Sequence, residues 1–342
     1  MGRPRRPSLA DVAARAGVSI GTVSHVLNHP ERVRAATRLR VREAIAELGF
    51  VRNANAHSLA GGGARTIGLV IPDIGNSLFV DIARAAQERA LENRTSLLVA
   101  DSNNDDALQD RHLEFFASAR VSGILLAPMR DPGIAVRRVR RLGIPVVLLN
   151  YAWDDDEHCS VVIDNRRAGE LAARHLLELG RRRLAFVGGH DELQPVRDRR
   201  EGVRSVVAAS RGLATLVEIP TEDLVATGGV HAAAALLGLP DLPDGVIAVT
   251  DLLAMGLLQT LVQHGVAVPD DLALMGSDDN ASAWGGSVPM TSVQMHGRAL
   301  GAAATALLTE EMTDADHEHR RVEVAPTLAV RESTAGRAPA DA

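Results

Sequence analysis

Polar side chains follow the apolar runs in the middle and C-terminal parts of the chain, where they could form hydrogen bonds to a ligand. They carry hydroxyl, amide and carboxylate groups, which together donate and accept hydrogen bonds as a neutral polyol requires. The residues concerned are Asp73, Asn76, Asp101, Asn150, Asp164, Thr250, Asp251 and Asp278. Phe79 and Trp284 stand out in a chain with 2% aromatic residues, and either ring could lie against the apolar face of a sugar. The pattern predicts a site for a small polar molecule, although each residue taken singly could instead cap a helix or occupy a loop.

Motifs that would indicate catalysis are missing from the sequence. No G-x-G-x-x-G or phosphate-binding loop follows a predicted strand, no predicted strand leads into a G-x-S-x-G turn, and no H-E-x-x-H occurs. His317 and His319 lie in an acidic run, which is more typical of an exposed loop than of a metal site. The one cysteine, Cys159, cannot form an internal disulfide and argues against a thiolate-rich metal site. We therefore expect no catalytic residues, no cofactor and no metal ligands, and hence no enzyme.

The elements that must position the polar residues are strands alternating with helices from Thr66 onward. The expected strands are 66–71, 96–100, 122–127, 144–149, 160–163, 184–188, 215–219, 245–249 and 272–275, with helices such as 78–93, 107–119, 166–179 and 252–264 between them. This alternation is typical of parallel sheets in doubly wound α/β domains. Ligands bind outside the carboxyl ends of the strands in such sheets. The length fits two lobes of this kind, with the site in the cleft between them.

Residues 8–28 indicate a different chemistry, because they have the pattern of two short helices joined by a tight turn. Val12 and Ala16 lie on the apolar face of the first helix, Gly17 can end it in the left-handed conformation, and Ser19 can cap the second. The outward side of the second helix carries Ile20, Gly21, Ser24, His25 and Asn28. A helix-turn-helix places the start of its second helix at the base edges in the DNA major groove. Helix pairs that never meet DNA share the pattern, so this segment alone leaves DNA binding open.

Charge is divided unevenly along the chain. Residues 1–60 hold ten arginines against four acidic residues, a net charge of +6, whereas the remainder carries −12 and the whole chain −6. A basic head on an acidic body favours a polyanion partner, since phosphate contacts supply most non-specific affinity for DNA. The competing interpretation is a solvated basic tail without a partner.

The motifs of the head, in combination, are those of a known family. They are Leu9-Ala-Asp-Val-Ala, Ala16-Gly-Val-Ser, Thr22-Val-Ser, Val26-Leu-Asn28, Thr37-Arg38, Ala44-Ile-Ala-Glu-Leu-Gly-Phe50, Asn53 and Ser58-Leu-Ala60. With them the chain resembles the LacI/GalR family of bacterial transcriptional regulators, and the resemblance continues in weaker form to Val330-Arg-Glu-Ser-Thr334. It covers nearly the whole chain and is most specific in the head.

The resemblance implies a division of the chain into segments. These are a basic tail 1–7, a helix-turn-helix head 8–50 with its third helix at about 36–48, a hinge 51–63, an effector-binding and dimerisation domain 64–334, and a disordered tail 335–342. Lobe 1 of the domain would comprise about 64–164 and 293–325, and lobe 2 about 165–292 and 326–334. The family's effector domain resembles periplasmic sugar-binding proteins, and we expect its three crossings between lobes near 164–165, 292–294 and 324–327.

The resemblance also implies the functional residues. The expected DNA contacts are Ser8, Leu9, Ser19, Ile20, Gly21, Thr22, Ser24, His25, Asn28, Arg34, Thr37, Asn53, His57 and Leu59. Leu59 matches a leucine that wedges into a base step of the minor groove, while Arg199 and Asp278 match residues that contact the effector. The full effector set is Asp73, Asn76, Phe79, Asp101, Asn150, Asp164, Arg199, Thr250, Asp251, Asp278 and Trp284. Ile20, Gly21 and His25 differ from the residues common in relatives, so the operator sequence cannot be predicted.

We therefore expect a cytoplasmic, nucleoid-associated homodimer that acts as a transcriptional repressor on a roughly palindromic double-stranded operator. A small molecule between the lobes, a sugar or related metabolite, would control its operator affinity. No apolar stretch is long enough for a membrane, and no apolar signal core follows the basic N-terminus. The alternatives are a sugar-binding protein without a role on DNA and an enzyme of the doubly wound class.

Overall fold

The computed structural model describes residues 7–50, 65–153, 157–189, 192–279 and 288–336. Contacts divide the chain into two compact units, a helical head within residues 1–65 and an α/β domain within residues 66–342. The predicted fold class, a helix-turn-helix head followed by two doubly wound lobes, is confirmed. None of the helices in the described part of the chain is both long and apolar enough to cross a bilayer.

The head consists of α1 (Leu9–Ala16), α2 (Ile20–Asn28), a 3-10 turn η1 (Pro30–Arg32) and α3 (Ala35–Leu48). Ser8 starts α1 with a capping box, in which its hydroxyl accepts from the Asp11 N–H and the Asp11 carboxylate accepts from the Ser8 N–H at 2.7 Å. Gly17, with φ at 62°, ends α1, and the Ser19 side chain caps α2. These local signals fix the turn between the two helices.

Small and β-branched side chains form the core of the head. Its buried members are Val12, Ala13, Ala16, Val23, Val26, Val41 and Ala44. Leu39 of α3 is not part of this core, because it is 59% exposed. It lies two residues before Val41 and therefore about 200° around the helix from the buried face.

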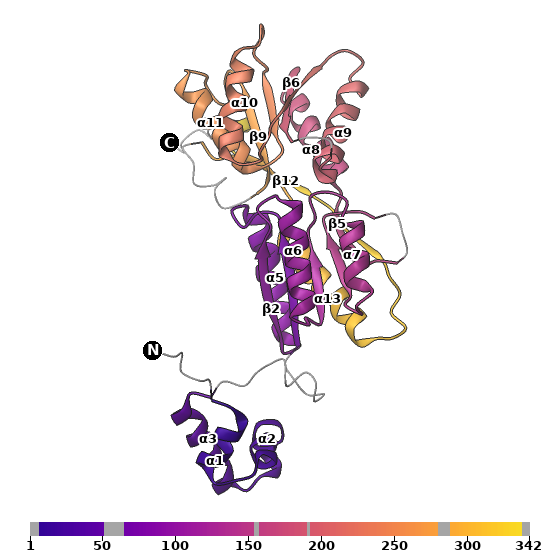
Figure 1. The fold of residues 1–342 in the computed structure, drawn as a ribbon. Helices are drawn as coiled ribbons and strands as arrows, with labels where there is room; N and C mark the ends of the chain where they lie inside the picture. Colours follow the sequence, from indigo (N-terminus) through magenta and orange to yellow (C-terminus); the bar gives the residue numbers. More distant parts are fainter. Residues whose placement is uncertain (1–6, 51–64, 154–156, 190–191, 280–287, 337–342) are drawn as a thin grey trace, which may run out of the picture. The chain divides into compact units, whose positions relative to one another are not determined.

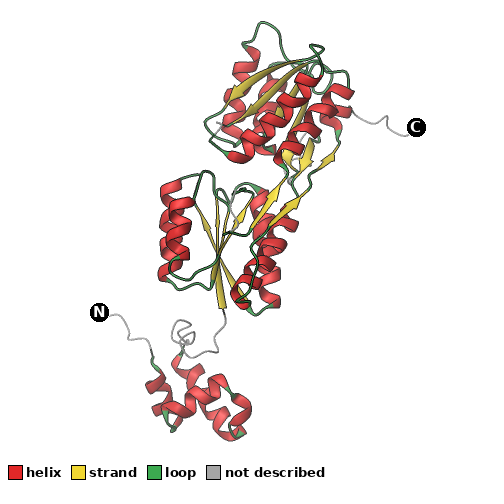
Figure 2. Ribbon diagram, turned by 90° about the vertical axis from the view of Figure 1, so that its right-hand side faces the viewer, coloured by secondary structure: helices red, strands yellow, loops and turns green. Residues whose placement is uncertain are grey.

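The α/β domain contains two six-stranded sheets (Figures 1 and 2). The first has the order β11 (Arg321–Val324), β5 (Ser160–Ile163), β4 (Val146–Leu149), β3 (Gly123–Leu126), β1 (Arg65–Ile71) and β2 (Thr95–Asp101). The second has the order β12 (Thr327–Ala329), β10 (Thr291–Gln294), β9 (Ala273–Asp278), β8 (Gly245–Ala248), β6 (Arg183–Gly188) and β7 (Thr215–Pro220). Pairing in the second sheet is parallel except between β10 and β12.

Helices cover both faces of each sheet, as Figure 2 shows. The first lobe, built on the first sheet, includes α5 (Ser77–Glu92), α6 (Asp106–Ser118), α7 (Gly133–Arg140) and α13 (Gly297–Thr313). The second lobe includes α8 (Asn165–Glu178), α9 (Gln194–Ala209), α10 (Ala226–Leu237), α11 (Asp251–Gln263) and α14 (Glu332–Ala335). The central strands are buried on both faces, which explains their continuous apolar runs.

The chain passes between the lobes three times. The passages follow β5, β10 and β11. The second comes slightly later than the sequence suggested, because β10 stays paired with β9 as far as Gln294 and the next helix begins at Gly297. Strands β10, β11 and β12 were not predicted as strands. The two outer ones, β11 and β12, are short and half exposed, so they lack the buried apolar run on which the prediction relied.

Helices α8 and α9 pack with their backbones in close contact. A Cβ atom on Gly169 would lie 1.9 Å from the Arg199 carbonyl oxygen, and one on Gly202 would lie 2.0 Å from the Arg166 carbonyl oxygen. Only glycine permits this approach at the two positions. This contact fixes the position of the α9 backbone at Arg199.

Candidate functional site

A pocket lies between the two lobes at the carboxyl ends of their strands. Its walls come from segments that follow β1 to β4 in the first lobe and β6 to β9 in the second. The lining residues are Pro72, Asp73, Asn76, Leu78, Phe79, Asn104, Met129, Asn150, Leu193, Pro195, Val196, Arg199, Leu224, Val225, Val249, Thr250 and Asp278. Mostly apolar walls with a few convergent polar groups are typical of small-molecule sites.

Arg199 is the buried cation of this pocket. Its Nε donates to Oδ1 of Asn165 at 2.9 Å, and its Nη1 donates to the Val249 carbonyl oxygen at 2.7 Å. Asn165 in turn donates to Oδ1 of Asn150 at 2.8 Å, which links the second lobe to the first. Burial lowers the pKa of Arg199, while the nearby Asp278 carboxylate counteracts that shift. Among the described residues, none accepts a hydrogen bond from Nη2 of Arg199.

Asp278 also joins the two lobes. Its carboxylate accepts a hydrogen bond at 3.0 Å from the side chain of Asn76, whose Oδ1 also caps α5. The backbone of Asp278 has φ at 107°, a conformation that L-residues rarely adopt and that often marks functional sites. Burial raises the pKa of Asp278 to about 6, although Arg199 and the Asn76 hydrogen bond oppose the shift. The pocket therefore holds an acid that titrates near neutrality.

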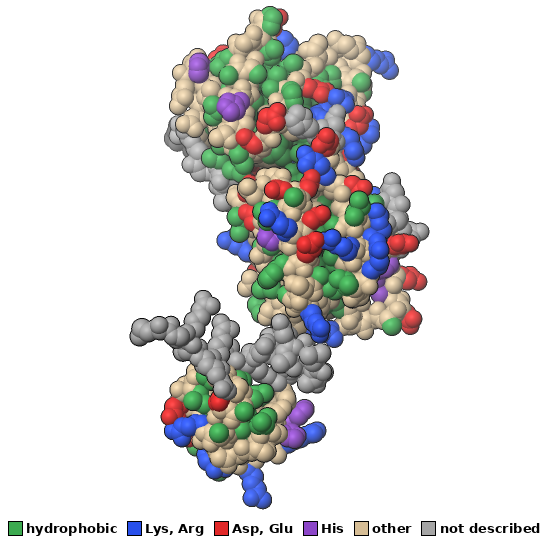
Figure 3. All heavy atoms as spheres, viewed as in Figure 1, with side chains coloured by type: hydrophobic (Ala, Val, Ile, Leu, Met, Phe, Trp, Pro, Cys, Tyr) green, Lys and Arg blue, Asp and Glu red, His purple; other side chains and the backbone are tan. Residues whose placement is uncertain are grey.

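The head presents a polar surface around α2. Every predicted DNA contact in the described head is at least partly exposed, and Ile20 is 52% exposed. Figure 3 shows histidine beside arginine side chains on the part of the head that carries α2. The predicted hinge contacts Asn53, His57 and Leu59 lie outside the described residues.

Comparisons with known proteins agree with this arrangement. The model of "Bacterial regulatory proteins, lacI family" matches residues 8–53, and that of a periplasmic binding protein-like domain matches residues 173–334. The ribose operon repressor of Escherichia coli (strain K12) is 30% identical, over 95% of this chain and 99% of its own. The transcriptional repressor PurR of Photobacterium profundum is 28% identical, over 95% and 98%. The solved complex of the transcriptional regulator CelR with cellobiose is 30% identical with a TM-score of 0.71, covering 96% of this chain and 100% of that chain.

The chain belongs to the lacI family of bacterial regulatory proteins. It is a DNA-binding transcriptional repressor and not an enzyme, as the sequence predicted. Its head is the part that the lacI-family model matches, and its two-lobed domain has the periplasmic-binding-protein fold.

Seven of the predicted effector residues of this LacI-family protein line the pocket, namely Asp73, Asn76, Phe79, Asn150, Arg199, Thr250 and Asp278. Three others have structural contacts instead. Asp101 accepts from the Ile74 and Asn103 amides, Asp164 caps α8, and Asp251 is fully buried and accepts from the Ser292 hydroxyl at 2.7 Å. Trp284 lies outside the described residues.

Some residues in and beside the pocket were not predicted from the sequence. Asn165 does not line the pocket, but its side chain connects two residues that do, Asn150 and Arg199. Leu193 and Val196 form part of the apolar wall near the start of α9. An apolar pattern alone does not distinguish such wall residues from ordinary core.

The acidic run 314–319, which was expected to be an exposed loop, is a loop in which Asp314, Ala315, Asp316 and Glu318 are exposed. Its two histidines are the exception, and the His317 side chain is only 5% exposed. It contacts the buried Cys159, as does His319.

Proposed function

We propose that this LacI-family protein is a homodimeric repressor whose operator affinity is set by a small, neutral, polyhydroxylated molecule bound in the pocket between the lobes. The observation that supports this most is the pocket itself, in which Arg199, Asp278 and Asn76 bring charged and amide groups among apolar walls. Hydroxyl groups can donate to the carboxylate and accept from the guanidinium at the same time. Two relatives point the same way, one a ribose operon repressor and the other a regulator solved with cellobiose.

The proposed control acts through the relative orientation of the lobes. The Asn76–Asp278 and Asn150–Asn165 hydrogen bonds connect them directly across the pocket. A ligand that competes for Asp278 or Arg199 would favour a different set of contacts and so a different lobe orientation. Because lobe 1 follows the hinge 51–63 in the chain, we infer that this change alters the spacing of two hinges in a dimer, and with it the fit to a palindromic operator in the cytoplasm.

The effector and the operator are expected to weaken each other's binding by the same factor, typically about 5- to 150-fold for coupled sites. A thermal-shift screen of the full chain against sugars, sugar phosphates and nucleosides identifies the effector, since a ligand raises the Tm of the form it binds. A duplex selected from random DNA serves as the operator. Effector affinity is then measured with and without this duplex, and DNA affinity with and without the effector. Equal effector affinity in both states would contradict the proposal, even if both molecules bind.

Operator recognition at α2 is proposed to involve His25 as a hydrogen-bond acceptor. Its Nδ1 is 3.0 Å from the Gly21 carbonyl oxygen, which can only accept, so this nitrogen carries the proton of the neutral ring. The other nitrogen, Nε2, is then an acceptor. In the major groove the amino groups of cytosine and adenine are the donors that suit it.

Effector binding is expected to weaken as the pH falls through about 6, because protonated Asp278 can no longer accept two ligand hydrogen bonds. The same raised pKa acts on stability with a definite sign. Its stabilising contribution is complete below the unfolded value near 3.8 and is lost as the pH rises through about 6. The Tm of Asp278→Asn relative to wild type should therefore increase between pH 5 and pH 7.

Asp110→Asn is the matched control, since Asp110 is an exposed carboxylate on α6. Thermal scans of the three proteins across this pH range test the assignment. If the Tm difference between Asp278→Asn and wild type changed with pH as little as that of Asp110→Asn, Asp278 would not titrate near pH 6.

A further inference from the structure

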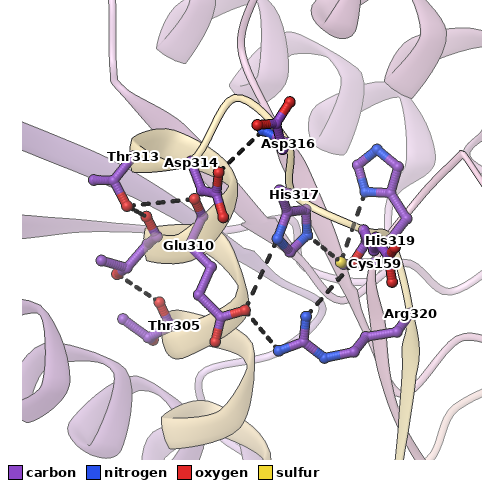
Figure 4. Close-up of polar contacts among 11 residues, drawn as sticks. Cys159, Thr305, Glu310, Thr313, Asp314, Asp316, His317, His319 and Arg320 are labelled. Carbon is purple, nitrogen blue, oxygen red and sulfur yellow. Dashed lines mark hydrogen bonds and ion pairs between the residues drawn. The ribbon is translucent and has the colours of Figure 1, made fainter.

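Cys159, the only cysteine of the chain, lies against two histidines far from the ligand pocket. It directly precedes β5, whereas His317 and His319 lie in the segment between α13 and β11. Figure 4 shows both imidazole rings converging on the sulfur atom. Glu311, from the last turns of α13, is the fourth member of the group.

The distances within this group match those between the ligands of one metal ion. The Cys159 Sγ atom is 3.1 Å from Nε2 of His317 and 3.7 Å from Nδ1 of His319. In a tetrahedral zinc site, Zn–S bonds of about 2.3 Å and Zn–N bonds of about 2.0 Å separate sulfur and nitrogen by roughly 3.5 Å. One ligand atom from each residue, including a Glu311 carboxylate oxygen, lies within 4.8 Å of every other.

The group is withdrawn from solvent, unlike an ordinary cluster of polar side chains on the surface. Cys159 is 0% exposed, and the side chains of His317 and Glu311 are 5% and 11% exposed. Among the described residues, no donor reaches the buried Oε2 of Glu311, although its Oε1 accepts from Arg140 at 2.9 Å. A buried carboxylate oxygen without a partner is costly, and an ion is one of the standard ways to satisfy it.

We propose that Cys159, Glu311, His317 and His319 bind a divalent ion of the zinc class. The sulfur and imidazole donors favour Zn²⁺ over the oxygen-preferring Mg²⁺ and Ca²⁺. On binding, the Zn–S bond replaces the S–H bond, and the thiol proton leaves for solvent. The two histidines bind as neutral rings through the nitrogens that already face the sulfur.

Arg140 must adjust when the ion binds. Its Nη2 is 3.3 Å from Nε2 of His319, which in this arrangement accepts the hydrogen bond. A neutral His319 that ligates through Nδ1 carries its proton on Nε2 and cannot accept there. Arg140 therefore gives up this contact and keeps its ion pair with Glu311, where it balances the negative charge of the ligand set.

The ion would connect three elements at the edge of the first lobe. Cys159 and His319 come just before the paired parallel strands β5 and β11, and Glu311 is on α13. Strand β11 is the edge strand of its sheet, and its residues are half exposed. Metal binding would thus anchor the starts of two strands whose opposite ends lead into the second lobe.

The experiment uses the full chain equilibrated with Zn²⁺, desalted, and analysed for bound metal and for Tm. We expect one zinc per chain and a Tm that falls on chelation. Loss of a residue that only orients a metal ligand typically lowers metal affinity by ~10- to 100-fold. Because His317 and His319 are proposed as ligands themselves, His319→Ala and His317→Ala should each weaken zinc binding by at least about 100-fold. His231→Ala, which removes an exposed histidine on α10, should leave the zinc content and the Tm shift unchanged.

A second measurement identifies the sulfur ligand by its spectrum in the wild-type chain. Loading the wild-type chain with Co²⁺ should give a thiolate-to-cobalt charge-transfer band, together with the intense visible bands of a tetrahedral ion. Cys159→Ser, which removes the buried thiol, should lack the charge-transfer band. The proposal would be overturned if wild type, His317→Ala and His319→Ala retained equal amounts of zinc. A wild-type cobalt spectrum without the thiolate band would overturn it as well.

Discussion

Replacing Arg199 with alanine is expected to abolish effector binding, whereas the full chain should still bind its operator. Arg199 lines the pocket, and its Nη2 is the donor that no described residue uses. A hydrogen bond to a charged group contributes about 1.5–3 kcal/mol, which is a ~10- to 150-fold change in affinity. If the effector forms two hydrogen bonds with the Arg199 guanidinium, loss of both would make its binding too weak to detect. The measurement is the effector-induced Tm shift, together with the effect of saturating effector on DNA binding.

Arg204→Ala is the matched control because it removes another arginine of α9. The Arg204 side chain is half exposed and pairs with Glu218 at 2.7 and 2.8 Å, away from the pocket. Its loss should change neither effector nor operator binding. Arg199→Ala also leaves acceptors on Asn165 and Val249 without their donor, at about 1–3 kcal/mol for each buried group. Arg199→Lys keeps the charge, so loss of DNA binding in both folded variants would show that Arg199 supports the domain rather than the effector.

The sequence predicted the pocket because its residues follow from strand order. Asn76 and Thr250 lie just after buried apolar runs, and in parallel sheets all such positions meet at one edge. Asp101 and Asp164 also occupy strand ends but do not line the pocket, because Asp101 accepts from the Ile74 amide in the loop after β1 and Asp164 accepts from the Arg167 amide in the first turn of α8. Side chains of these types serve both purposes, and only the direction in which they point distinguishes them.

Contacts between distant segments could not be read from the sequence. Cys159 and His317 are brought together because β5 and β11 pair as parallel neighbours, a register that no local pattern specifies. Asn165 likewise acquires its role only because α8 packs on α9 through Gly169 and Gly202. Local signals such as the Gly17 helix end and the Ser19 cap were predicted because each depends on residues within one turn.

Replacing Ile20 with aspartate is expected to lower operator affinity by roughly 100-fold or more without unfolding the head, since one wrong base contact alone costs about 1–3 kcal/mol. Ile20 is the first residue of α2 and is 52% exposed, so its side chain contributes little to the core. Aspartate in a first helical turn interacts favourably with the helix dipole, so α2 should remain formed. At the proposed DNA surface, however, the carboxylate would face base acceptors and phosphates. Titration of the selected duplex by fluorescence anisotropy, at several salt concentrations, measures the loss.

Ala46→Asp provides the control because it adds the same charge at an exposed position on α3. If the effect of Ile20→Asp came only from the net charge of the head, both variants would lose the same amount of affinity relative to the wild type. That loss would vanish at high salt. A contact at the base edges predicts instead that Ile20→Asp loses selectivity for the operator over random DNA, whereas Ala46→Asp keeps it. If Ile20→Asp kept its selectivity for the operator over random DNA, another surface of the head would have to contact the operator bases. The start of α2 could not make those contacts with a carboxylate at this position.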